Sequence, residues 1–261
     1  MPVLNSGGIN LHYELDGHGP PLVLIAGYTC DLTQWALVRR ELAAHHRLLL
    51  FDNRDSGRSE NSAGPYSVAE LAADAAGLMQ SLGIGKAHVL GHSLGGAIAQ
   101  TLAAEHPHLV DRLILSNTFL KFSAVTTAAF RRLLARRGEG HPAASLCEAA
   151  LPWVYSNRFL SNPANIESTI AAMLANPQTF DGQSRQFDAL VNFDSRCWFK
   201  NIAAPTLVIA GAEDICAPPT GAHELANGIP GARLAILPGM GHVPLLEMPS
   251  EFARLVLDHL A

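Results

Sequence analysis

A chain of 261 residues, 48% hydrophobic and 16% charged, is long enough to bury a large core, and one domain with an insertion describes it more simply than two domains. Its formal net charge of -5 argues against a nucleic-acid partner, because proteins that bind phosphate backbones usually carry a concentrated basic face. No uncharged apolar run reaches the roughly 18 residues of a membrane span, and the first residues lack a secretory signal, so we expect no membrane partner.

The four cysteines are widely spaced and form no CxxC pair, which argues against a zinc knuckle and against a thioredoxin-like site. We therefore expect reduced thiols in a cytoplasmic protein. The twelve histidines show no metal-ligand spacing, and most of them, including His12 and His88, are expected at the surface or at helix ends. The sequence thus predicts no metal site.

The first third of the chain alternates strand-like and helix-like segments. Short apolar or period-two runs predict strands at residues 9–15, 21–27, 47–52 and 86–91. Helical spacing follows at residues 32–45 and 67–83, and the second of these helices is expected to begin with a capping box formed by Ser67 and Glu70. This alternation predicts an α/β protein with a doubly wound, mostly parallel sheet that is covered by helices on both faces.

The alternation continues with a helix at residues 97–107 and a strand at residues 111–117, and then stops. Residues 119–203 contain helices broken by prolines and polar loops, and the β/α pattern resumes at residue 204. We therefore divide the chain into a first core part (residues 1–118), a helical insertion (residues 119–203) and a second core part (residues 204–261). An all-helical block between two strands of one sheet is expected to form a cap over the edge of that sheet.

The stretch "HVLGHSLGGAIAQ" contains a G-x-S-x-G motif centred on Ser93. An apolar strand precedes it and a helix of small residues follows, which is the context that a nucleophile elbow requires. Gly91 and Gly95 would remove the side chains that collide at the two flanking positions, and Gly96 would let the helix approach the sheet. A glycine-rich turn without chemistry remains the alternative at this point.

A serine hydroxyl is a weak nucleophile near neutral pH, so a base and a group that orients this base are also needed. Asp214 follows the strand in "LVIAGAED", and His242 follows the next strand in "LPGMGH". The order Ser, Asp, His along the chain belongs to one of the three unrelated triad families. Glu213 is a competing carboxylate beside Asp214, whereas Asn117 is an amide and cannot be the charged partner.

These motifs, together with "LIAGY" and "FDNRDSGRSE", occur in order over nearly the whole chain, which therefore resembles the capped α/β-hydrolases that include esterases, lactonases and carbon-carbon hydrolases. The resemblance implies that Ser93 is the nucleophile, His242 the general base and then acid, and Asp214 the orienting carboxylate. It favours Asp214 over Glu213, because the acid of this family lies three residues after a glycine. No cofactor is implied.

The resemblance also implies an oxyanion hole made by the backbone N–H groups of Tyr28 and Leu94. Many relatives have His-Gly before the first of these donors, whereas this chain has Ala26-Gly27. In the motif "FDNRDSGRSE", Asp55 replaces a glycine that many relatives have. We interpret Arg54, Asp55 and Ser59 as turn residues that bond mainly to their own backbone.

The helical insertion carries no motif that identifies a substrate. Thr29 and Cys30 lie in the oxyanion loop, and Trp153 is the first choice among the aromatic residues of the insertion, so these three are the candidate pocket residues. The arginines near residues 131–137 are interpreted as a solvated helix face.

The sequence predicts hydrolysis of a small carboxylic ester or lactone through an acyl-enzyme. Carbon-carbon or enol-lactone hydrolysis is the main alternative, and a buried arginine in the insertion would favour it. A ligand receptor without turnover is a further alternative. The partner is a small molecule, and a homodimer is left open.

Overall fold

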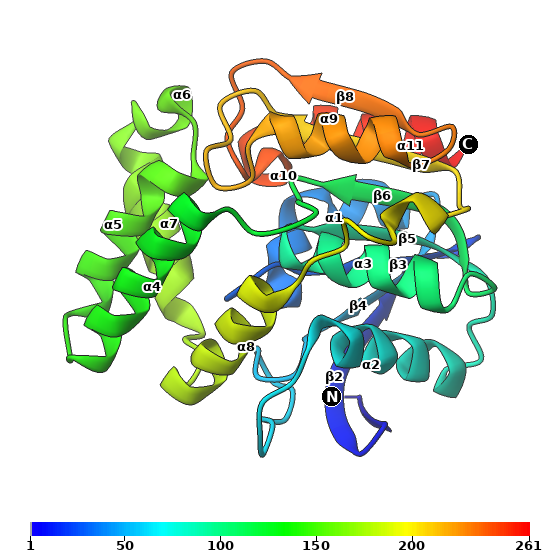
Figure 1. Cartoon of the computed structure of the whole chain (residues 1–261), viewed down its shortest axis with the longest axis horizontal. Helices are drawn as coiled ribbons and strands as arrows, with labels where there is room; N and C mark the ends of the chain where they lie inside the picture. Colours follow the sequence, from blue (N-terminus) through cyan, green and yellow to red (C-terminus); the bar gives the residue numbers. More distant parts are fainter. Residues whose placement is uncertain (1) are drawn as a thin grey trace.

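The computed structural model describes residues 2–261 and contains one eight-stranded sheet (Figure 1). The strand order is β1-β2-β4-β3-β5-β6-β7-β8. In chain order the strands are β1 Val3–Ser6, β2 Ile9–Asp16, β3 Pro21–Ile25, β4 Arg47–Phe51, β5 Ala87–His92, β6 Val110–Ser116, β7 Thr206–Gly211 and β8 Arg233–Leu237. Strands β3 to β8 pair in parallel, whereas β1 and β2 pair antiparallel at one edge.

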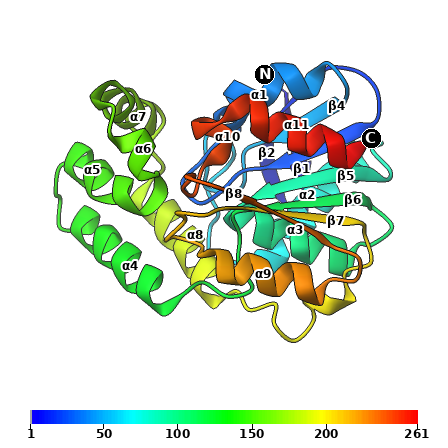
Figure 2. The ribbon, with the colours of Figure 1, turned by 90° about the horizontal axis from the view of Figure 1, so that it is seen from above.

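Helices cover both faces of this sheet, as Figure 2 shows. The helices of the core are α1 Ala36–Ala43, α2 Val68–Ser81, α3 Leu94–Glu105, α9 Pro219–Gly228, α10 Pro244–Glu247 and α11 Pro249–Leu260. Helices α1 and α11 pack on one face, and α2, α3 and α9 pack on the other, so that each face has its own apolar core. Strands β5 and β7 are buried at every position because both of their faces are covered. The predicted doubly wound sheet is confirmed.

Local signals explain where several elements begin. Helix α2 starts with the predicted capping box: the Ser67 side chain accepts a hydrogen bond from the Glu70 N–H, and the Glu70 carboxylate accepts one from the Ser67 N–H. Strand β1, which the sequence did not predict, forms a hairpin with β2 through two left-handed glycines, Gly7 and Gly8. No helix within residues 2–261 has the length and hydropathy to cross a bilayer.

Two histidine predictions are wrong. His12 on β2 is only 1% exposed, and its Nδ1 lies 3.0 Å from the Oδ2 of Asp52. His88 on β5 is also buried, and burial lowers the pKa of its imidazole. Both histidines lie on strands of the central sheet, where packing from other elements covers side chains that single-sequence patterns place at the surface.

Five α-helices lie between β6 and β7, followed by a short 3-10 helix at Phe199–Asn201. The α-helices are α4 Ala124–Gly138, α5 Ala143–Val154, α6 Asn157–Leu160, α7 Pro163–Ala175 and α8 Phe180–Asn192. Figures 1 and 2 show α4 to α7 gathered beside the core, with α8 running back along it. Helix α8 buries five residues, whereas α7 buries none. The helical insertion is therefore attached to the core mainly through its last helix.

Candidate active site

Ser93 lies in the sharp turn between β5 and α3. Its φ of 55° and ψ of -117° are strained values for a residue with a side chain. A Cβ on Gly91 would overlap the carbonyl of Gly95, and a Cβ on Gly95 would overlap the carbonyl of Ile25 at the end of β3. Gly91 and Gly95 thus permit the turn. Gly96, which was predicted to let the helix approach the sheet, instead leaves space for the Thr118 side chain.

Backbone strain is concentrated around this turn. Among residues 2–261, the non-glycine residues with positive φ are Thr29, Asp55, Ser93 and Asn117. Ser93 and Asn117 directly follow strands β5 and β6. Thr29 and Asp55 lie in the loops that follow strands β3 and β4. Each such residue costs of the order of 1–3 kcal/mol and persists only where its surroundings hold it, which is typical of functional sites.

His242 and Asp214 meet beside the turn, as the sequence predicts for the ends of adjacent strands. The Nδ1 of His242 lies 2.8 Å from the Oδ2 of Asp214. The same carboxylate accepts hydrogen bonds from the Asn117 Nδ2, at 2.9 Å, and from the Ala217 N–H, at 2.8 Å. In the neutral imidazole, an Nδ1–H that donates to Asp214 leaves the Nε2 of His242 without a proton, which is the form a general base needs.

Asn117 is a site residue whose role the sequence analysis missed. Its side chain donates to both Asp214 and the Gly241 carbonyl, so it joins the carboxylate to the loop that carries His242. Glu213, the competing carboxylate, is exposed and accepts a hydrogen bond from the Asn157 N–H instead of contacting His242. Of the two adjacent acids, only Asp214 is hydrogen-bonded to the imidazole.

His92 is the last residue of β5, directly before Ser93, and its ring packs against that of His242, with their centroids 5.0 Å apart. Burial, together with the neighbouring His242, lowers the pKa of His92 well below its usual value. His92 is therefore a neutral ring that supports the position of His242.

The loop of residues 26–31 follows β3 and is called the oxyanion loop because it carries Tyr28. It runs past Ser93: a Cβ on Gly27 would come within 3.3 Å of the Cβ of Ser93. Within residues 2–261, the backbone N–H groups of Tyr28 and Leu94 donate to no acceptor. The N–H groups on both sides of Tyr28 are occupied: Gly27 donates to the Gln34 Oε1 and Thr29 donates to the Gln186 Oε1, each at 2.9 Å. Both predicted oxyanion donors are thus free, and neither of the two glutamines was singled out from the sequence.

Besides Gln186, the helical insertion reaches the site at two further places. The carbonyl of Val154, at the end of α5, accepts a 2.7 Å hydrogen bond from the His242 N–H. Its neighbour Trp153 makes an edge contact with Phe130, which makes another with Tyr28. Trp153 is therefore joined to the oxyanion loop through one intervening aromatic ring.

Thr29 is exposed, and Cys30 is partly buried in the same loop. Burial, with a smaller effect of Asp31, raises the pKa of the Cys30 thiol to about 12. Cys30 is thus protonated near neutral pH and is a poor competitor of Ser93 as nucleophile.

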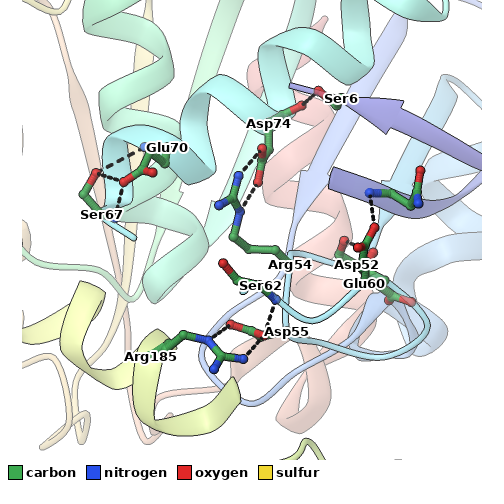
Figure 3. A network of polar contacts seen from close by, with 12 residues as sticks. Ser6, Asp52, Arg54, Asp55, Glu60, Ser62, Ser67, Glu70, Asp74 and Arg185 are labelled. Atoms are coloured by element: carbon green, nitrogen blue, oxygen red, sulfur yellow. Dashed lines mark hydrogen bonds and ion pairs between the residues drawn. The ribbon is translucent and has the colours of Figure 1, made fainter. Parts of the chain in front are cut away.

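The loop after β4 contains more than local turn bonds (Figure 3). Ser59 does bond locally, to the Asp52 carbonyl, but Arg54 forms a two-bond ion pair with Asp74 on α2. Asp55 forms a second such pair with Arg185 on α8, at 2.6 and 3.0 Å. The prediction of mainly local bonding is wrong for the side chains of Arg54 and Asp55, because their charged partners lie on elements that are distant in sequence.

No group of three or more His, Cys, Asp and Glu side chains within residues 2–261 has a metal-binding arrangement.

The arginines of residues 131–137 are exposed except for Arg137, which is partly buried and bonded to Gln183 and to the Gln178 carbonyl. Two aromatic residues of the insertion, Phe130 and Phe187, contact the ring of Tyr28.

Known proteins of similar sequence and structure share this architecture. A family model described as the alpha/beta hydrolase fold matches residues 20–249. RutD of Azorhizobium caulinodans, which carries the name carbamate hydrolase, is 31% identical, with 98% of this chain and 97% of RutD covered. The enol-lactonase from Burkholderia xenovorans LB400 is 31% identical, covers 99% of each chain and has a TM-score of 0.90. A thermophilic esterase from Thermogutta terrifontis has a TM-score of 0.87 at 28% identity, covering 99% of this chain and 96% of its own. The chain therefore belongs to the α/β-hydrolase fold family.

Proposed function

We propose that this protein is a serine hydrolase that cleaves small carboxylic esters or lactones through an acyl-enzyme. The observation that carries the proposal is the 2.8 Å hydrogen bond between His242 and Asp214 beside the strained turn that presents Ser93. The Ser93 hydroxyl has no hydrogen-bond partner within residues 2–261, and the bond to the base is expected to form when substrate binds.

Acylation begins when the Ser93 Oγ attacks the substrate carbonyl carbon. The hydroxyl proton passes to the His242 Nε2, and the electron pair of the carbonyl double bond moves onto its oxygen. Asp214 stabilises the resulting imidazolium through the Nδ1 hydrogen bond. The tetrahedral intermediate then collapses, and the departing alkoxide takes the proton from His242, which leaves Ser93 esterified.

The negatively charged oxygen of this intermediate is placed between the N–H groups of Tyr28 and Leu94, neither of which donates to an acceptor within residues 2–261. Leu94 is the first residue of α3, so the positive end of that helix also favours an anion there. Each donor of such a hole is worth roughly 2.7–4 kcal/mol.

Deacylation repeats these steps with water as the nucleophile. The His242 Nε2 takes a proton from water, the hydroxide attacks the acyl carbon, and the same hole receives the oxyanion. Collapse breaks the bond to the Ser93 Oγ, which recovers its proton from His242 as the acid is released.

We place the substrate between the oxyanion loop and the helical insertion, which acts as the cap. Thr29 and Cys30 are the pocket residues on the core side, and Trp153 is the one on the insertion side. The rings of Phe130 on α4 and Trp153 on α5 form an aromatic surface beside Tyr28, and this surface favours an uncharged acyl or alcohol group over an anionic one. Free thiols at all four cysteines support a cytoplasmic location.

Enol-lactone hydrolysis is a second candidate, because the enol-lactonase from Burkholderia xenovorans LB400 matches this chain from end to end. Carbon-carbon hydrolysis of an acidic diketone has less support. Arg131, Arg132 and Arg136 are exposed. The partly buried Arg137 is already bonded to Gln183 and to the Gln178 carbonyl, and Arg185 is already paired with Asp55.

The test compares the wild type with Ser93→Ala on p-nitrophenyl acetate, p-nitrophenyl butyrate, a γ-lactone, an enol-lactone and a phenyl carbamate, the substrate class in the name of RutD. We expect ester or lactone turnover by the wild type, no turnover by Ser93→Ala, and a fluorophosphonate adduct that mass spectrometry maps to Ser93. Equal rates for the two proteins, or an adduct elsewhere, would overturn the assignment of the nucleophile. Tight binding of one compound without turnover would identify a receptor instead.

A further inference from the structure

Two buried glutamine oxygens hold the oxyanion loop on either side of Tyr28. Gln34 lies in the short helix that follows the loop and accepts the Gly27 N–H, and Gln186 lies on α8 and accepts the Thr29 N–H. Because both neighbouring N–H groups are fixed, the peptide group of Tyr28 between them has little freedom to rotate. These two bonds therefore set the direction of the one N–H that remains free.

The two glutamines differ in origin. Gln34 is seven residues from Gly27, whereas Gln186 is separated from Thr29 by 157 positions and belongs to the helical insertion. The orientation of the Gln186 amide is itself fixed, because its Nε2 donates to the Ser56 Oγ and its Oε1 also accepts from the Gln178 Nε2. The Gln186 side chain is 0% exposed, so no water competes for its oxygen.

The residue that Gln186 holds is strained. Thr29 has a φ of 62°, a value that a β-branched residue rarely adopts. Its own hydroxyl donates to the Tyr28 carbonyl and so does not replace the bond to Gln186. Without an acceptor at its N–H, Thr29 is free to return to negative φ, and that change would rotate the adjoining peptide groups.

We propose that Gln186 is a positioning residue for the oxyanion hole, so that the helical insertion completes the hole as well as covering it. Gln186 does not touch the reacting atoms; it acts through the Thr29 N–H to keep the Tyr28 N–H directed at the substrate oxygen. The inference rests on the proposed function of Ser93, His242 and Asp214. It also supplies a physical account of how this loop keeps its shape with Ala26-Gly27 before Tyr28.

The test measures kcat and KM on a short acyl ester for the wild type and for Gln186→Met, which keeps the length of the side chain but removes the acceptor. Gln186→Glu keeps an oxygen for the Thr29 N–H and is the conservative variant. The matched control is Arg185→Lys, which weakens the neighbouring contact between α8 and the core without touching Thr29. Circular dichroism checks that each variant is folded.

For Gln186→Met we expect kcat to fall by at least about tenfold with KM changed less than about twofold, because the lost interaction acts mainly in the transition state. Gln186→Glu should recover most of kcat, and Arg185→Lys should stay within about twofold of the wild type. The affinity for a trifluoromethyl ketone, whose hemiketal oxygen occupies the hole, should fall in parallel with kcat, whereas that for the product acid should not.

A kcat for Gln186→Met close to that of Arg185→Lys, or an unchanged affinity for the trifluoromethyl ketone, would overturn this inference while leaving the proposed function intact. If Gln186→Met does not fold, Ser56→Ala replaces it, since it removes the acceptor that orients the Gln186 amide; a kcat within about twofold of the wild type would then overturn the inference. Failure of the proposed function is seen separately, as activity or fluorophosphonate labelling that does not require Ser93.

Discussion

The sheet core and the helical insertion contribute to the site in different ways. The core supplies residues that follow the ends of consecutive sheet strands: Tyr28, Ser93, Asn117, Asp214 and His242. The insertion supplies acceptors and packing surfaces that reach those loops from outside, through Val154 and Gln186. In our interpretation the core therefore carries the chemistry, and the insertion holds two of the loops on which the chemistry depends.

The insertion is itself divided. Helix α8 is fixed to the core by Gln186 and by the Arg185–Asp55 ion pair, whereas α7 buries no residue and exposes Met173 and Leu174. Helix α5 touches the core at its end, through Val154. This difference separates a positioning role, assigned to α8, from a selectivity role, assigned to the aromatic surface of α4 and α5.

The largest effect expected from a change in the core is that of Asp214→Asn. An amide in this place no longer fixes the His242 tautomer, so we expect kcat to fall by about 10⁴-fold with little change in thermal stability. Ester hydrolysis under steady-state conditions measures it. Glu213→Gln is the control, because Glu213 does not contact His242; a comparable loss in this control would show that the wrong carboxylate has been assigned.

A smaller effect, on stability instead of rate, is expected where α8 meets the core. Arg185→Met leaves the fully buried Asp55 carboxylate with the Ser62 N–H but without its charged partner. We expect the free energy of unfolding to fall by about 3 kcal/mol, as measured by urea denaturation. Arg132→Met removes an exposed pair with Glu139 and should cost less than about 1 kcal/mol. Equal losses in the two variants would show that the Asp55 pair does not fasten the insertion.

The smallest effect is expected at the aromatic surface. Trp153→Ala removes the ring that packs on Phe130, so KM for aromatic acyl esters should rise roughly fivefold while kcat stays nearly constant. A comparison of KM for acetate and benzoate esters measures this selectivity. The exposed Met173 is the control position, and Met173→Ala should leave both constants unchanged. A fall in kcat without a change in KM would mean that Trp153 acts on the catalytic loops and not on the substrate.

Local patterns predicted much of the core. The run before Gly91 and the small residues after Ser93 placed the turn between a strand and a helix, and Ser67 with Glu70 placed the start of α2. The hydrogen bond of Asp214 to His242 joins two residues that the sequence had already selected. Such features could be predicted because each depends on residues close together in the chain, or on strands whose order follows from their connections.

The sequence by itself determined the fold class, the positions of the strand ends and the candidate triad, since hydrophobic period and turn residues act over short distances. Only the tertiary structure showed that Asn117 joins Asp214 to the His242 loop, that His12 and His88 are buried, and that Asp55 pairs with Arg185. The tertiary structure alone showed that the Gln186 Oε1 accepts a hydrogen bond from the N–H of Thr29, 157 positions away in the sequence. A hydrogen bond between distant residues leaves no periodic trace in the chain, because its geometry is decided by how whole helices pack against the sheet.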